Sequence, residues 1–175
     1  MNKDKKPLAP LPPAQWPPEL DDIRRELGEP LNIHNIMAHH PALTRAWMPY
    51  RNHIVANSSL KPRQRELLIL RTADNCDTAY EWEHHVVRGR KAGLSDAEIQ
   101  RVKDGPGADQ WSPADRVLLQ AADECHGNSE INETTYQELC LHFDEHQQLD
   151  IIATVGMYMT LATIIKTYKL PMEEA

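Results

Sequence analysis

The side chains best suited to chemistry lie close together in the middle of the chain. Glu66 stands in the run RELLILR, and Glu81 and His85 stand in the run YEWEHH that follows it. Glu81 and His85 are four residues apart, so on a helix they share one face. Imidazole titrates near neutral pH, and burial moves the pKa of a carboxyl group up toward the same range. We therefore expect Glu66, Glu81 and His85 to be catalytic residues that hold and move protons.

Three neighbours of these residues are candidate contacts for a substrate. Tyr80 and His84 are also four residues apart, one position round the helix from Glu81 and His85, and Trp82 lies between them. We expect Tyr80, Trp82 and His84 to bind the substrate.

Three of these residues also have a purely structural alternative. The tetrad Thr78-Ala79-Tyr80-Glu81 fits a capping box, in which Glu81 would bond back to the start of its own helix. Glu66 can pair with Arg63 or Arg71, and Trp82 can simply pack in the core.

Two helices are required to bring the candidate residues together. The first extends from about Lys61 to Asn75 and is apolar round its middle, which indicates burial. The second extends from near Thr78 to Ala92 and is followed by Gly93, a frequent residue after helix ends. The turn between them is short, so the helices must be antiparallel. Glu66 then faces the Glu81 and His85 helix, and which of the two carboxyl groups lies closer to His85 stays open.

This central region resembles the carboxymuconolactone decarboxylase family, which also contains alkylhydroperoxidase-like proteins. The resemblance rests on the run from Arg65 to Arg71, on the motif Tyr80-Glu81-Trp82-x-x-His85, and on the tail from Ala92 to Ile99. It extends more loosely over roughly residues 30 to 170. It implies an all-α, single-domain helical bundle of the alkylhydroperoxidase-like type.

The resemblance also distinguishes two kinds of chemistry. The peroxidase branch uses a Glu, a Cys-x-x-Cys pair and a His; Glu66 and His85 match the Glu and the His, whereas Thr78 and Glu81 stand at the two Cys positions. The other branches imply an acid–base site without metal or organic cofactor. Such a site acts on a small carboxylated or lactone-type molecule, and we expect a lyase similar to the decarboxylases.

Composition sets further limits on the class of protein. A chain of 175 residues with only 7 glycines and long runs of helix formers favours one all-α domain. The formal net charge of −7 argues against nucleic-acid binding. The three cysteines, Cys76, Cys125 and Cys140, show no disulfide spacing, which indicates free thiols in the cytoplasm. Residues 151–165 form the longest uncharged stretch, which is shorter than the roughly 20 residues of a membrane span and is therefore predicted to be a buried helix.

The chain divides into an arm and a domain. Residues 1–18 are rich in proline and should form an extended arm, with Trp16 as a possible anchor on this or another subunit. Residues 19–175 should form the single helical domain. Short helices are expected before Gly28 and around residues 31–39, and a longer one from Pro41 to about Asn57, broken near Pro49.

The rest of the chain reads as four further helices. They are predicted from Ser95 to about Lys103, from Ser112 to about His126, from Asn132 to about Phe143, and from Glu145 to Tyr168.

A metal site is the first competing interpretation. His142 and His146 are four residues apart and could bind a metal, but the residues between them look like a helix boundary, so we expect neither metal nor cofactor.

Two further functions compete with the lyase. A peroxide-reducing or redox protein would depend on Cys76, the one thiol near the motif. A non-catalytic helical oligomer would keep the site for packing or for a small ligand. A homo-oligomer is expected in any case, as a trimer or hexamer first and a dimer second.

Overall fold

The computed structural model describes residues 8–173, and within this range the regular elements are all helical. The arm forms two short 3₁₀ turns, Pro13–Gln15 and Pro18–Leu20. They lead into α1 (Asp21–Leu27), α2 (Asn32–Met37) and α3 (Pro41–Asn52). The expected all-α fold is confirmed.

The break expected near Pro49 lies a few residues further on. Pro49 stays inside α3, and the helix then widens into a π-helical turn at His53–Asn57. Asp150 of the last helix holds this turn and the loop after it. It accepts hydrogen bonds from His53 Nε2 at 2.6 Å and from the amide and hydroxyl of Ser59 at 2.6 and 2.7 Å.

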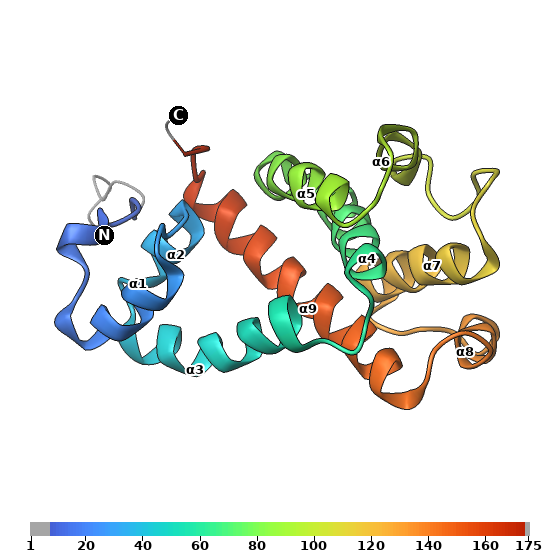
Figure 1. Ribbon diagram of the computed structural model, residues 1–175, viewed down its shortest axis with the longest axis horizontal. Helices are drawn as coiled ribbons and strands as arrows, with labels where there is room; N and C mark the ends of the chain where they lie inside the picture. Colours follow the sequence, from blue (N-terminus) through green and yellow to red (C-terminus); the bar gives the residue numbers. More distant parts are fainter. Residues whose placement is uncertain (1–7, 174–175) are drawn as a thin grey trace, which may run out of the picture.

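The centre of the fold is the pair α4 (Pro62–Asn75) and α5 (Ala79–Lys91). The pair is followed by α6 (Asp96–Val102), α7 (Pro113–Asn128), α8 (Glu133–Cys140) and α9 (Glu145–Tyr168). Helix α4 packs against α5, α7 and α9, which explains why its middle is apolar on every side. In Figure 1, α9 runs diagonally between the α1–α3 group and the α4–α8 group.

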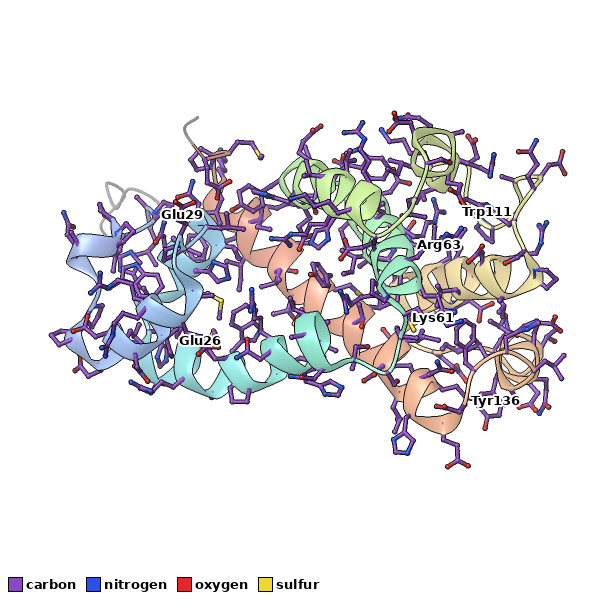
Figure 2. All side chains as sticks on the ribbon, in the orientation of Figure 1. Glu26, Glu29, Lys61, Arg63, Trp111 and Tyr136 are labelled. Atoms are coloured by element: carbon purple, nitrogen blue, oxygen red, sulfur yellow. The ribbon has the colours of Figure 1, made fainter. Side chains whose placement is uncertain are left out.

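Local signals set most of these boundaries. Ser95, Ser112 and Asn132 each accept a hydrogen bond from a backbone N–H in the first turn of the following helix, as the sequence predicted. Gly93, two residues past the end of α5, has φ +96°, a conformation that residues with a Cβ rarely adopt. Arg63, near the start of α4 (Figure 2), then ties α6 and α7 to that helix through ion pairs with Glu98 and Asp115.

Helix α9 is long and apolar enough to cross a membrane by length and composition alone. Half of its most apolar window is nevertheless buried inside the fold, and it packs against α4 and α7. Residues such as Ile151, Val155 and Met157 belong to the core. This agrees with the buried helix that the sequence predicted.

The arm is fixed to the domain over its described residues. Trp16 is buried, and its indole Nε1–H donates to Asn35 Oδ1 at 3.0 Å. The Leu11 amide donates to the Asn35 carbonyl oxygen at 3.1 Å. Trp16 therefore anchors the arm on α2 of the same chain.

Candidate active site

A narrow cavity lies where α2, the end of α3, α5 and α9 meet. About 50 Å³ of it is accessible to the centres of water molecules, which is enough for a few waters or one small organic group. Most of its wall is apolar, and the polar groups come from a few positions: His34, Arg51, Tyr80, Glu81, His84, His85, Arg88 and Tyr158.

Glu66 and His85 form a buried polar pair at the site. His85 Nδ1 lies 2.6 Å from Glu66 Oε2, and both side chains are almost completely buried. The Tyr158 ring meets the imidazole edge-on, with centroids 5.0 Å apart. Of the two carboxyl groups that the sequence left open, Glu66 is therefore the partner of His85.

The other ring nitrogen of His85 faces Arg88. Arg88 Nη1 lies 3.1 Å from His85 Nε2, and a guanidinium can only donate. The contact therefore places a lone pair on Nε2 and the ring proton on Nδ1, where it is donated to Glu66. Burial lowers the pKa of His85 and the Arg88 charge lowers it further, while Glu66 acts in the opposite direction. His85 is thus a neutral imidazole.

Glu81 differs from Glu66 in having no partner. It is buried beside the cavity, and neither of its carboxyl oxygens has a hydrogen-bond partner among the described residues. Burial raises the pKa of Glu81 to about 8, so the group is largely protonated at neutral pH. Glu81 is therefore a neutral acid beside a cavity.

The capping-box alternative for Glu81 is not what the structure shows. Thr78 precedes α5 without a side-chain cap, and its hydroxyl donates to the Cys76 carbonyl oxygen instead.

The expected substrate contacts separate into two groups. Tyr80 and His84 line the cavity, and both bind Glu173 of the carboxy-terminal segment: the Tyr80 hydroxyl lies 2.5 Å from Oε1 and His84 Nε2 lies 2.8 Å from Oε2. Trp82 does not line the cavity. It packs against the core, with the Lys103 ammonium 4.5 Å from its ring centroid.

Sequence reasoning missed several residues of this cavity. His34, Trp47, Arg51 and Tyr158 come from three other helices, and Arg88 lies one turn beyond His85. His34 and Trp47 form a tilted aromatic pair with centroids 6.3 Å apart. The spacing of Arg88 three residues after His85 was the one local signal available.

The histidine pair considered for a metal lies elsewhere. His142 is in the turn after α8 and His146 is in the first turn of α9. Across residues 8–173 no group of three or more His, Cys, Asp or Glu side chains is arranged to hold a metal ion.

Comparison with known proteins supports the resemblance given by the sequence. Residues 41–124 match the model of the carboxymuconolactone decarboxylase family. No curated protein matches the chain. The matched segment ends within α7 and contains α3, α4, α5 and α6, so it includes both Glu66 and His85.

Solved structures with the same fold cover nearly the whole chain. An alkylhydroperoxidase core protein of Ralstonia eutropha, a peroxidase-related protein, is 19% identical to this chain and superposes with a TM-score of 0.79. The match covers 97% of this chain and 95% of the Ralstonia chain. A peroxidase-related protein of Silicibacter is 19% identical with a TM-score of 0.79, and the match covers 99% of this chain and 95% of the Silicibacter chain. The debrominase Bmp8 in complex with 2,3,4-tribromopyrrole is 15% identical with a TM-score of 0.80, and the match covers 97% of this chain and 93% of the Bmp8 chain. At these identities the similarity establishes the alkylhydroperoxidase-like fold.

Proposed function

Because residues 41–124 carry the segment that characterises the carboxymuconolactone decarboxylase family, we propose that this chain is a cofactor-free acid–base enzyme, a lyase that acts on a small carboxylated or lactone-type molecule. The observation that carries the proposal is Glu81, a carboxyl group that is buried beside the cavity and has no hydrogen-bond partner within residues 8–173. A buried acid that stays protonated near neutral pH is suited to give its proton to a substrate.

In a decarboxylation, the C–C bond to the carboxylate breaks and carbon dioxide leaves. The bonding electrons pass into the conjugated carbonyl or lactone group, and the proton of Glu81 ends on the carbon that lost the carboxylate. Glu81 then recovers a proton from water. His85 is not the proton donor in this proposal, because the Arg88 contact and the burial of the ring favour neutral His85 as a base.

The Glu66–His85 pair provides a base for a lactone substrate. His85 Nε2 takes a proton from water, the resulting hydroxide adds to the lactone carbonyl carbon, and the proton of Glu81 goes to the departing ring oxygen. Glu66 accepts the Nδ1–H bond and stabilises the imidazolium that forms. Tyr80 and His84 are proposed as polar contacts for the substrate.

The lyase proposal is tested with purified protein and a panel of γ-lactones that carry carboxylates, with carbon dioxide release and lactone consumption followed separately. We expect Glu81→Gln to reduce both rates by about 100-fold or more, the usual size of a general-acid contribution. Glu83→Gln is the matched control because Glu83 is an exposed glutamate on the same helix. A wild-type protein that releases no carbon dioxide from any member of the panel, or a fully active Glu81→Gln variant, contradicts the proposal.

A second candidate function is peroxide reduction, which the names of two structural relatives suggest. It needs a reactive thiol, and Cys76 does not line the cavity. Burial raises the pKa of the Cys76 thiol, and this lowers the thiolate fraction at neutral pH. If the protein does reduce peroxides, Cys76→Ser should abolish that activity; an unchanged Cys76→Ser variant contradicts this candidate.

We further propose that the chain forms a cytoplasmic homo-oligomer. Leu149 and Ile152 are large apolar side chains on the exposed side of α9, next to the exposed Gly156. A second copy that covered this face would bury them. The same surface serves the third candidate, a non-catalytic helical oligomer that keeps the site for packing or for a small ligand. If Glu66→Gln and His85→Asn change thermal stability but not ligand affinity, the packing role is favoured.

A further inference from the structure

Two guanidinium groups face the cavity without a counterion in the part of the chain that the structure describes. Arg51 lies at the end of α3 and Arg88 on α5, and both line the cavity. Between residues 8 and 173, neither lies within ion-pair distance of a carboxylate. Partly buried arginines elsewhere are paired, as Arg63 is with Glu98 and Asp115.

The lack of a counterion matters because Arg51 is half-buried. Its one side-chain hydrogen bond among the described residues is to Asn52 Oδ1, at 2.9 Å. Burial lowers the pKa of Arg51, and the charge of Arg88 lowers it further. A partly desolvated cation near a second cation is unfavourable until an anion joins them.

The negative groups around the cavity are already engaged or neutral. Glu66 is bound to His85, and Glu173 is bound to Tyr80, His84 and the Asn32 amide. Glu81 is held largely in its neutral form. None of these carboxyl groups therefore serves as a counterion for Arg51 or Arg88 among the described residues.

We infer that Arg51 and Arg88 bind the carboxylate of a small organic anion, and that this binding draws Arg88 away from His85 and leaves Nε2 free to act as a base. The inference rests on the proposed function and adds the charge class of the substrate. A carboxylate is the natural ligand because it accepts two parallel hydrogen bonds from a guanidinium. If the reaction is a decarboxylation, the carboxylate that Arg51 and Arg88 bind stays on the substrate, and a different carboxylate leaves as carbon dioxide.

The Arg88 contact links recognition to chemistry. Arg88 Nη1 donates to the lone pair of His85 Nε2, so the base cannot take a proton while this contact is made. Arg88 is an exposed side chain, free to turn toward a ligand. A neutral ligand offers no charge to attract it and leaves the base occupied, so the pair selects for anions.

The inference is tested by calorimetric titration with 5-oxotetrahydrofuran-2-carboxylate, a small anionic lactone, and with its neutral methyl ester. Arg51→Gln and Arg88→Gln are compared with Arg90→Gln, since Arg90 is an exposed arginine on α5 paired with Asp96. We expect each of the first two changes to weaken binding of the acid by about 10- to 100-fold, the worth of a charge-assisted hydrogen bond. Binding of the ester should not change, and Arg90→Gln should affect neither ligand.

A second measurement follows His85 directly. The ¹⁵N resonance of Nε2 is assigned by comparison with His85→Asn. When the acid binds, its chemical shift should move toward the value of an imidazole nitrogen that accepts no hydrogen bond. In Arg88→Gln the chemical shift of Nε2 should already have this value before any ligand is added. Thermal unfolding of each variant shows whether it is folded.

The outcomes separate this inference from the proposed function. Acid and ester binding with equal affinity, no binding of the acid, or undiminished acid binding in Arg51→Gln and Arg88→Gln would overturn the anion site. Selective binding of the acid without any turnover supports the anion site and counts against the lyase. Turnover of neutral lactones that is insensitive to both arginine changes supports the enzyme and overturns the anion site.

Discussion

Glu81 ties the stability of the protein to its acid–base chemistry. Its pKa is raised from 4.5 to about 8, so between these values the folded state keeps a proton that the unfolded state has lost. The folded state then binds more protons, and stability falls as pH rises. Above about pH 8 both states are ionised and this contribution becomes constant.

We expect wild-type protein to lose on the order of a few kcal/mol of unfolding free energy from pH 5 to pH 8 relative to Glu81→Gln. The measurement is urea unfolding at a series of pH values. Glu83→Gln should follow the wild-type curve, because Glu83 is exposed on the same helix. Parallel curves for wild type and Glu81→Gln would mean that Glu81 ionises normally.

Glu66 should act through His85, which makes it a positioning residue. In Glu66→Gln the amide oxygen can still accept the Nδ1–H bond, but the negative charge that stabilises imidazolium is gone. The pKa of His85 should fall further, so the acidic limb of the pH–rate profile for lactone opening should move to lower pH, with the rate about 100-fold lower. An unshifted limb would show that the Glu66 charge does not tune His85.

At the residue scale, spacing predicted the central cluster but not its surroundings. The four-residue spacing placed Glu81 and His85 on one face of a helix, and the short turn placed Glu66 opposite that helix, because helical geometry and chain reversal are local properties. Arg51 and Tyr158 could not be found in this way, since α3 and α9 reach the cavity only through tertiary packing.

At the scale of elements, the loop after α3 depends on Asp150. His53, Ser58 and Ser59 donate hydrogen bonds to this carboxylate, and together they lower the pKa of Asp150 to about 2 despite its burial. The folded-state pKa lies below the ordinary value of 3.8, so the stabilisation is present above about pH 4 and is lost as pH falls through about 2.

Asp150→Asn should therefore cost about 2 kcal/mol of unfolding free energy at pH 7. The loss should disappear near pH 2, where the wild-type carboxyl group is also protonated. Chemical unfolding at both pH values checks this, with Asp144→Asn as a control that alters only an exposed cap. An equal difference at both pH values would assign the effect to packing instead of charge.

Most element boundaries were predictable because caps and glycines act locally. Ser95, Ser112 and Asn132 start helices as expected, and α9 has the expected bounds, Glu145–Tyr168. The π-helical turn at His53–Asn57 was not predicted, because its side-chain partner Asp150 is 97 residues away from His53.

At the scale of the whole molecule, the two ends of the described chain meet the same small helix. Trp16 binds Asn35 of α2 from the amino-terminal side, and the Glu173 carboxylate binds the Asn32 amide at 2.7 Å from the other end. Neither contact is visible from local sequence. Both brace the helix that carries His34 into the cavity wall.

Assembly should depend on the exposed side of α9. We expect Ile152→Glu to lower the oligomeric state measured by light scattering, because the change places a charge on the apolar face formed with Leu149. The exposed Leu141, after α8, provides the control, since Leu141→Glu makes the same kind of change elsewhere. An unchanged mass for Ile152→Glu would remove α9 from the interface.

Trp47 lines the cavity and lies against His34, so the chain carries its own optical reporter. Indole emission depends on the polarity and the quenchers around the ring, and both change when a molecule displaces water beside it. Occupancy can thus be followed by intrinsic fluorescence without a label. A Trp47→Phe variant separates this signal from that of the three remaining indoles, Trp16, Trp82 and Trp111.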